Sequence, residues 1–124
     1  MQIHESGENY LEAILMLKME KGAVRSIDVA HQLEVSKPSV SRAMGLLREN
    51  GYITVDGEGW IELTPAGQEI AERIYERHHL LTQWLTQLGV PPEIAAEDAC
   101  RIEHDISAVT FAKMKEHIQK AGKE

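Results

Sequence analysis

Three side chains that could bind a transition metal lie close together near the C-terminal end of the sequence. Cys100, Glu103 and His104 are spaced i, i+3 and i+4, so a helix would project all three from one face. Thiolate, carboxylate and imidazole together suit a divalent cation such as Fe²⁺, Mn²⁺, Co²⁺ or Zn²⁺. Taken alone the triplet is a weak signal, because a single cysteine is more often a small core residue and a Glu–His pair is more often a surface pair.

A histidine on a different predicted helix strengthens the case for a metal site. Apolar side chains recur every three or four residues from about residue 65 to residue 89, which predicts a long helix. His78 falls inside this apolar stripe, between Ile74 and Leu81, so its ring is expected to point inward, whereas His79 should face away. A buried histidine needs partners for its ring nitrogens. Either a hydrogen bond within the core or a metal ion would provide them.

The polar face of a first predicted helix, from about residue 6 to residue 20, offers two further oxygen ligands. Asn9 and Glu12 lie on this face, one turn apart. One interpretation is a solvated acidic face. The other is that both side chains reach the metal, which would then connect the first helix to the second half of the chain.

Two more helices and a hairpin are predicted after the first helix. Ser26 and Ser36 are expected N-caps, and Pro38 suits the first turn of the helix that Ser36 begins. The sequence Asp56-Gly57-Glu58-Gly59 between two strand-like segments is a strong hairpin signal. Helix, helix, tight turn, helix and hairpin is the order of a winged helix-turn-helix, which predicts DNA binding through the third helix.

The third predicted helix would fit the major groove of DNA with its polar face. A solvated face on a module that does not bind DNA is the plain alternative. We expect Lys37, Arg42 and Arg48 to contact phosphate, and Ser39 and Ser41 to hydrogen-bond to bases or phosphate.

The sequence predicts a mostly α-helical fold in two parts. Residues 1–64 form a winged helix-turn-helix with a two-stranded wing, and residues 65–124 form a helical dimerisation and metal-binding domain. The end of the long helix carries more apolar surface than a small domain readily covers, which indicates a two-fold dimer. The residues expected at this interface are Leu80, Leu81, Trp84, Leu85 and Leu88.

Composition limits the classes of function. Hydrophobic residues make up 43% and charged residues 27% of the 124 residues, as in globular proteins. No apolar run is long enough to cross a membrane, and Cys100 has no second cysteine to pair with, so we expect a cytoplasmic location. The net charge of −7 argues against a non-specific coat on nucleic acid, although a bound divalent cation would lower it.

The sequence resembles the metal-dependent repressors related to the diphtheria toxin repressor and the manganese transport regulators, over nearly the whole chain. The motifs that carry the resemblance are Glu8-Asn9-Tyr10-Leu11-Glu12-Ala13-Ile14, Ser36-Lys37-Pro38-Ser39-Val40-Ser41, Leu63-Thr64-Pro65-Ala66-Gly67, Arg77-His78-His79-Leu80-Leu81 and Cys100-Arg101-Ile102-Glu103-His104. The resemblance implies a homodimer that binds Mn²⁺ or Fe²⁺ as co-repressor, with Co²⁺ or Zn²⁺ substituting in vitro. It also implies a palindromic operator in double-stranded DNA and control of metal-uptake genes.

The resemblance also implies a hybrid set of metal ligands. His78, Glu103 and His104 match ligands found in both branches of the family. Cys100 matches the iron-type branch, and Glu12 matches an acidic ligand of the manganese-type branch.

Some positions depart from the family pattern. Asn9 stands where the two branches place methionine or aspartate. The ancillary site of the iron-type proteins falls on His78, Thr82 and Ala96, so two of its three donors are missing. Glu97, one turn before Cys100, is a candidate for a second metal. The chain stops where iron-type proteins continue into a third domain, as the shorter two-domain members do.

Three other functions compete with the metal sensor, and no enzymatic activity is expected. One is a winged-helix regulator that responds to an organic ligand or to oxidation of Cys100. Another is a small zinc hydrolase, but the sequence supplies no oriented nucleophile for it. The third is a winged helix that binds protein and not DNA.

Overall fold

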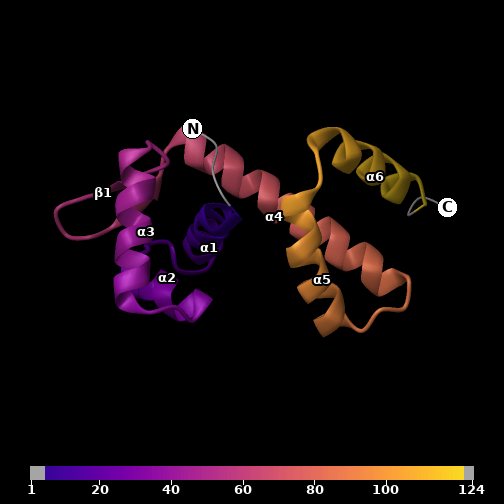
Figure 1. The fold of residues 1–124 in the computed structure, drawn as a ribbon, viewed down its shortest axis with the longest axis horizontal. Helices are drawn as coiled ribbons and strands as arrows, with labels where there is room; N and C mark the ends of the chain where they lie inside the picture. The colour runs from indigo at the N-terminus through magenta and orange to yellow at the C-terminus, as the bar shows by residue number, and fades with distance from the viewer. Residues whose placement is uncertain (1–4, 122–124) are drawn as a thin grey trace. The chain divides into compact units, whose positions relative to one another are not determined.

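The computed structural model describes residues 5–121, and the predicted domain ends at residues 1–4 and 122–124 lie outside this range. The chain divides into two compact units, one ending at Arg73 and the other beginning at Ile74 (Figure 1). The mostly helical prediction is confirmed. In chain order the elements are α1 (Glu5–Lys21), α2 (Ser26–Leu33), α3 (Lys37–Glu49), β1 (Ile53–Val55), β2 (Ile61–Leu63), α4 (Pro65–Gln87), α5 (Pro92–Asp105) and α6 (Ala108–Ala121).

The first unit gathers three helices and the hairpin around one apolar core. Helix α1 packs against α2, α3 and β2, and α3 also packs against β1 (Figure 1). Burial of branched apolar side chains is the main force that holds these elements together. The side chains with at most 2% exposure in this core include Leu11, Ile14, Val24, Val29, Val40, Ile53 and Ile61.

Side-chain hydrogen bonds set the start of α2 and of α3. Ser36 caps α3 as predicted, since its Oγ accepts a hydrogen bond from the Ser39 backbone N–H at 3.3 Å. The prediction that Ser26 is an N-cap is wrong: Arg25 occupies that position. The physical reason is Asp28, whose Oδ2 accepts a hydrogen bond from the backbone N–H of Arg25 at 2.9 Å. This bond makes Arg25 the N-cap, so α2 begins at Ser26, one residue earlier than predicted.

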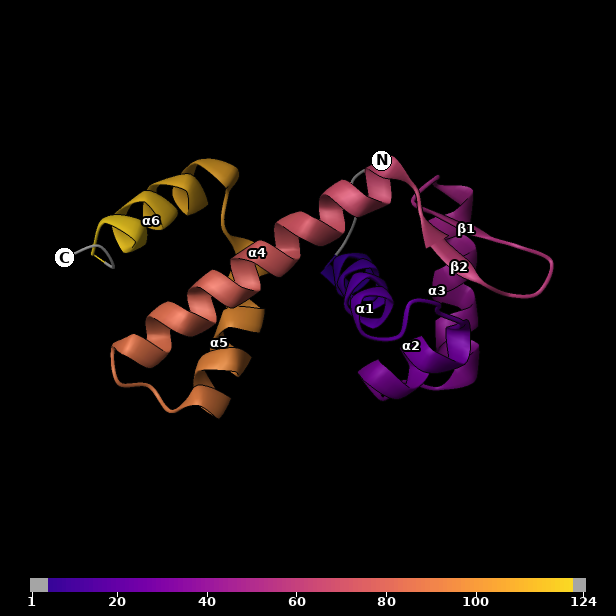
Figure 2. The same cartoon turned by 180° about the vertical axis from the view of Figure 1, so that it is seen from behind.

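The hairpin is a two-stranded antiparallel sheet beside α3 (Figure 2). Ile53 pairs with Leu63 and Val55 with Ile61, which turns Ile53 and Ile61 toward the core. The Oδ1 atom of Asp56 accepts the backbone N–H groups of Glu58 and Trp60, both at 2.9 Å, and this closes the turn. The predicted hairpin is therefore present.

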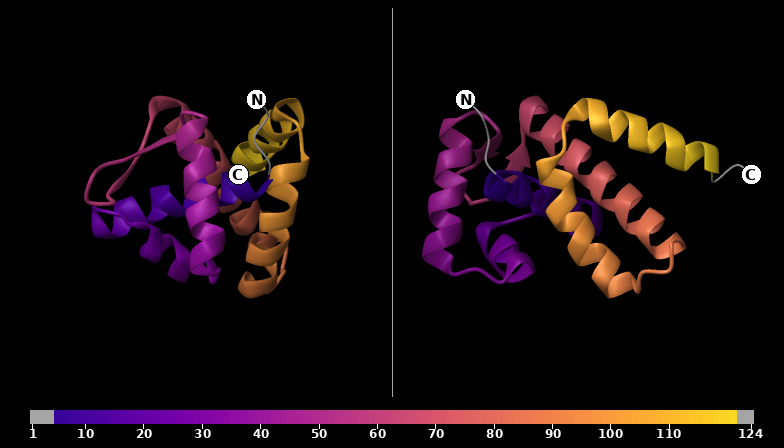
Figure 3. Two further views of the ribbon diagram at one scale, coloured as in Figure 1. Left: turned by 60° about the vertical axis from the view of Figure 1, so that its left-hand side comes forward. Right: turned by 45° about the vertical axis from the view of Figure 1, so that its right-hand side comes forward.

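The second unit contains the C-terminal part of α4 together with α5 and α6 (Figure 3). Its buried apolar side chains are Ile74, Leu81, Ala95, Ala99 and Phe111. Alanines at the α5 contact allow that helix to lie close to its neighbours. An ion pair of 3.0 Å between Lys115 and Glu76 joins α6 to α4. None of the described helices is long and apolar enough to span a membrane.

Candidate metal centre and DNA-binding surface

The centre of the candidate metal site is the carboxylate of Glu103, which has no exposed surface. Its Oε2 lies 2.9 Å from Nδ1 of His78, so α5 and α4 meet through a hydrogen bond between two titratable groups. Placing a carboxylate fully inside a protein is costly unless a charge or hydrogen bonds compensate. A divalent ion held by this carboxylate and the neighbouring imidazoles would supply such compensation.

The triplet on α5 has the geometry that the sequence predicts. Glu103 Oε1 lies 3.4 Å from Nε2 of His104, whose side chain is 1% exposed. One ligand atom from each of Cys100, Glu103 and His104 falls within 4.8 Å of the others. Metal bonds of about 2.0–2.3 Å place ligands on opposite sides of one ion roughly 4–4.6 Å apart, so a small adjustment of these side chains would hold an ion. Among residues 5–121, Glu103 Oε1 has no hydrogen-bond partner.

Arg77 is a buried charged residue next to the candidate site that the sequence analysis did not single out. It is 6% exposed, and its Nη1 donates to the backbone carbonyls of Glu103 at 2.9 Å and Ile106 at 3.0 Å. The guanidinium carbon also lies 5.1 Å from the ring centroid of Phe111 on α6. These contacts fix the C-terminal end of α5, whose last carbonyls have no partner within the helix. Arg77 therefore positions the segment that carries Glu103.

The remaining predicted ligands are in different surroundings. Asn9 and Glu12 are half-buried, share one face of α1 and belong to the first unit. Thr82 is half-buried on α4, and Ala96 offers no donor atom. Glu97 is exposed and is not among the clustered ligand atoms of the described residues.

The predicted dimer surface changes in one position. Leu81 is fully buried within the chain, so it is a core residue and is removed from the set expected to meet a second copy. Leu88 is 64% exposed, and nearby Ile94 on α5 is 48% exposed. Leu80, Trp84 and Leu85 are half-buried.

Helix α3 separates an apolar face from a polar one. Val40, Met44 and Leu47 are buried, as the period of the helix predicts. The five side chains predicted to contact DNA are all exposed: Lys37, Ser39, Ser41, Arg42 and Arg48. Ser36 Oγ donates a hydrogen bond to Ser39 Oγ at 2.9 Å, so the hydroxyl of Ser39 is partly engaged in the helix cap.

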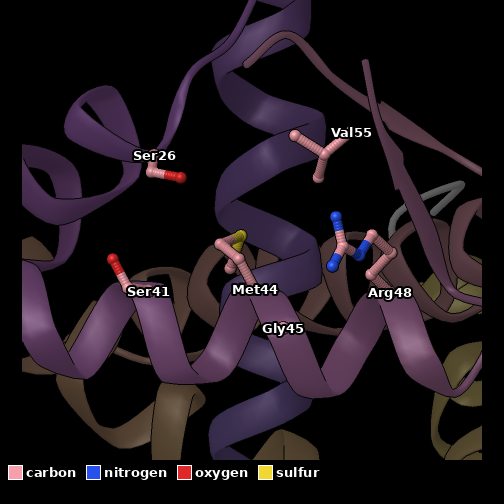
Figure 4. A pocket seen from close by; sticks show the side chains of 6 residues that line it. All are labelled: Ser26, Ser41, Met44, Gly45, Arg48 and Val55. Atoms are coloured by element: carbon pink, nitrogen blue, oxygen red, sulfur yellow. The ribbon is translucent and has the colours of Figure 1, made fainter. Parts of the chain in front are cut away.

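A pocket of about 190 Å³ opens on one flank of this polar face. Figure 4 shows the Arg48 guanidinium and the hydroxyls of Ser41 and Ser26 around it, so one cation and two hydroxyls line the same opening. Val55 of β1, together with Met44 and Gly45 of α3, completes the lining of the pocket. Such a group of donors suits a phosphate oxygen better than a cation.

The turn of the hairpin has the opposite charge. Asp56 and Glu58 are the titratable residues of the turn, and both are exposed. Behind them the guanidinium of Arg25 stacks on Trp60, with 4.0 Å from its carbon to the ring centroid. The cations of this unit that face outward on α3 are therefore better placed for phosphate than the tip of the wing.

Two protein-family models match the chain, one for each part. The iron dependent repressor N-terminal DNA binding domain matches residues 2–59. The iron dependent repressor metal binding and dimerisation domain matches residues 64–123.

Curated relatives agree with these matches. The transcriptional regulator MntR of Salmonella typhimurium is 38% identical over 104 residues, which cover 84% of this chain and 66% of that protein. The HTH-type transcriptional regulator MntR of Lysinibacillus sphaericus is 32% identical and is matched over 82% of its length and 92% of this chain.

Solved structures share the fold. The manganese regulator SloR superposes with a TM-score of 0.81 at 25% identity, and IdeR of T. acidophilum with 0.79 at 27%. Each match covers 96% of this chain but 55% of the other protein, so the chain spans little more than half of these two structures. With both of its parts matched, the chain belongs to the iron-dependent repressor family, whose members are transcriptional regulators and not enzymes.

Proposed function

We propose that this protein is a cytoplasmic, metal-dependent repressor that binds Mn²⁺ or Fe²⁺ and then binds a palindromic operator as a homodimer. Its targets would be genes of metal homeostasis. The observation that carries the proposal is the fully buried carboxylate of Glu103 between His78 and His104, in a chain that also has a DNA-binding domain. A buried acid with two imidazoles beside it is suited to holding a divalent ion.

His78, Cys100, Glu103 and His104 are the ligands that we propose for the second unit. The bound ion would supply the positive charge that the buried carboxylate needs. Imidazole and carboxylate accept both Mn²⁺ and Fe²⁺, whereas the softer sulfur of Cys100 favours Fe²⁺, Co²⁺ or Zn²⁺ over Mn²⁺. We therefore expect Co²⁺ and Zn²⁺ to bind in vitro as well.

We further propose that Glu12, and with it Asn9, completes the site from α1. The support is their shared helix face and the family resemblance of the sequence around them. Such a link would restrict the angle between the two units when the ion is bound, so that fewer wrong arrangements compete with the one that fits DNA. An allosteric coupling of about 1–3 kcal/mol would change operator affinity roughly 5- to 150-fold.

The DNA contacts that we propose come from α3. Lys37, Arg42 and Arg48 would contact phosphate, with the Arg48 pocket holding one phosphate oxygen. Ser39 and Ser41 would bond to bases or phosphate. The acidic turn of the hairpin is expected to stay away from the phosphates.

The homodimer that we propose presents two α3 helices to DNA. Leu80, Trp84, Leu85 and Leu88 would meet the second copy, and the exposed Leu88 is the strongest candidate. A two-fold axis relates the two half-sites of a palindrome, which are separated by about 34 Å per turn of DNA.

The test is a titration of DNA binding under anaerobic conditions with Mn²⁺, Fe²⁺, Co²⁺, Zn²⁺ and chelator. The duplexes would be genomic fragments from upstream of metal-transport genes. We expect metal to raise affinity at least fivefold, and Glu103→Ala to remove this gain while leaving the fold and the dimer intact. Equal affinity with and without metal would refute the proposal. Control of binding by alkylation of Cys100 in the absence of metal would point to a thiol switch instead.

A further inference from the structure

We propose that Leu46 determines sequence specificity by contacting the C5-methyl group of a thymine in the major groove. This inference rests on the proposed DNA-binding function and adds to it a particular base. It concerns a residue that neither the metal site nor the phosphate contacts use.

Leu46 is exposed on a helix that buries its other large apolar side chains. It is 53% exposed, whereas Val40, Met44 and Leu47 are 2%, 5% and 6% exposed. Leaving a leucine half in water forgoes part of the free energy that burial would give. Single exposed leucines are common on protein surfaces, so the exposure alone decides nothing and the position must carry the argument.

The position of Leu46 is on the polar side of α3. It follows Arg42 by four residues, so the two side chains are neighbours on one face of the helix, and both are exposed. Glu49, three residues after Leu46, also lies on this face, whereas Lys37 and Arg48 lie on the other side of the helix from Leu46. One cation and one acid beside Leu46 leave this face without a net charge, so it is the match of residues 2–59 to a DNA binding domain that favours DNA as its occupant.

The floor of the major groove offers one apolar group, the thymine methyl. A leucine that enters the groove gains contact area against this methyl and against none of the other base edges. In this arrangement Arg42 would contact a base in place of the phosphate proposed above, because its guanidinium can donate two hydrogen bonds to O6 and N7 of guanine. Leu46 and Arg42 together would therefore read a thymine and a guanine.

The spacing between these two bases follows from helix geometry. Four residues of an α-helix rise about 6 Å, and neighbouring base pairs are about 3.4 Å apart. With the helix lying along the groove, the thymine read by Leu46 is expected about two base pairs from the guanine read by Arg42.

The experiment removes the methyl group without changing base pairing. Duplexes that bind the full-length protein in the presence of Mn²⁺ are first selected from a random pool. In the most enriched duplex, each thymine is then replaced, one at a time, by deoxyuridine. At one thymine per half-site we expect about a fourfold loss of affinity, the value of one buried methyl. The Leu46→Ala variant should bind the parent duplex more weakly and should show no further loss with uracil at that position.

Met19→Ala is the matched control. Met19 is also an exposed apolar side chain of the first unit, at 58%, but it lies near the end of α1. This variant should keep the full sensitivity to uracil. Circular dichroism and ultracentrifugation would accompany each variant, because a change in oligomeric state on replacing Leu46 would identify a second copy as its partner and overturn the inference.

The remaining outcomes separate this inference from the function on which it rests. If no duplex is enriched in the presence of metal, the proposed metal-dependent DNA binding itself is rejected. Selected duplexes that tolerate uracil at every thymine would reject only the role of Leu46. The same follows if the Leu46→Ala protein loses affinity on uracil replacement as much as the parent does.

Discussion

Replacing Glu103 by glutamine should abolish the stabilisation of the protein by metal. The amide keeps the shape of the side chain but removes the negative charge that lies 2.9 Å from His78 and 3.4 Å from His104. Glutamine is a poor ligand for a divalent ion. Its buried amide would also form hydrogen bonds with the two imidazoles, which would then be less available to bind the ion.

The size of the effect follows from linkage. An ion at about 100 times its dissociation constant stabilises the folded state by about 2.7 kcal/mol. For a chain of this length, roughly 4 °C per kcal/mol gives an increase in Tm of about 10 °C for the parent protein. The metal-free stability of the Glu103→Gln variant should stay within about 1 kcal/mol of the parent, because the lost ion pair and the avoided desolvation of the carboxylate have opposite signs.

The assay is thermal unfolding in Mn²⁺ and in chelator, with Glu116→Gln as the matched control. Glu116 is exposed on α6 and pairs with Lys113 and Lys120 at the surface, where such pairs contribute little. The control should retain the full increase in Tm. A Glu103→Gln protein that gains as much from Mn²⁺ as the parent would show that Glu103 does not bind the ion, and the reasoning from its burial would fail.

Three further changes test the surrounding structure. Arg77→Met should lower the free energy of unfolding in urea by about 1–3 kcal/mol, since it leaves two carbonyls without their donor. It should also lower the affinity for Co²⁺ about 10- to 100-fold. Unchanged Co²⁺ affinity would show that Arg77 packs the domain but does not position the metal ligands. The hydrogen bond from the Arg25 backbone holds the pKa of Asp28 below its ordinary value, so this residue stabilises the fold above about pH 4 and less as pH falls through the lowered pKa. Asp28→Ala should therefore cost about 0.5–1 kcal/mol at pH 7 and progressively less as the pH falls below about 4. A cost that does not change with pH would contradict this. Gly67→Ala should lower the free energy of unfolding by about 1–3 kcal/mol, because the new Cβ would overlap the carbonyl of Tyr52. Gly45→Ala has open space around its Cβ among the described residues and should stabilise α3 by up to about 1 kcal/mol. Equal effects of the two substitutions on the free energy of unfolding would refute the steric argument.

The fold could be predicted from the sequence because short-range patterns of residues identify each helix and the hairpin. The 3.6-residue period marks each helix, and Ser36 and the turn at Asp56 each place a boundary with their own side chain. The error at Ser26 has the same local origin. Serine is the more common N-cap, but Asp28 can satisfy the backbone N–H of Arg25 only when the helix begins at Ser26.

The site was only partly predictable, because sequence spacing describes one helix at a time. The triplet on α5 follows from its spacing, and the stripe on α4 turns His78 inward, but neither pattern states that His78 and Glu103 bond directly. Arg77 was missed because an arginine is usually taken as exposed. Its distance of three residues from Ile74 puts it beside the buried stripe, and this was the available signal.

Leu81 shows the matching limit for apolar residues. A leucine in the stripe of a helix is equally consistent with the core of its own chain and with a dimer interface. Its complete burial in the described chain decides for the core, while the exposure of Leu88 leaves that residue for a partner. Only the packing of other elements over the stripe distinguishes these two cases.

The charge of the chain bears on how a metal would control DNA binding. A divalent ion adds two positive charges to a protein with a net charge of −7. If Cys100 binds the ion as a thiolate, the protein loses one proton, and the net gain is one positive charge. Charges in solution are screened beyond about 8–10 Å, and the α3 cations that are proposed to contact phosphate are present with or without the ion. We expect ordering of the two units to supply most of the proposed coupling of about 1–3 kcal/mol. If charge dominated instead, the slope of log affinity against log salt would steepen on adding metal; control by ordering raises affinity while the number of phosphate contacts per bound dimer, and hence the slope, stays nearly the same.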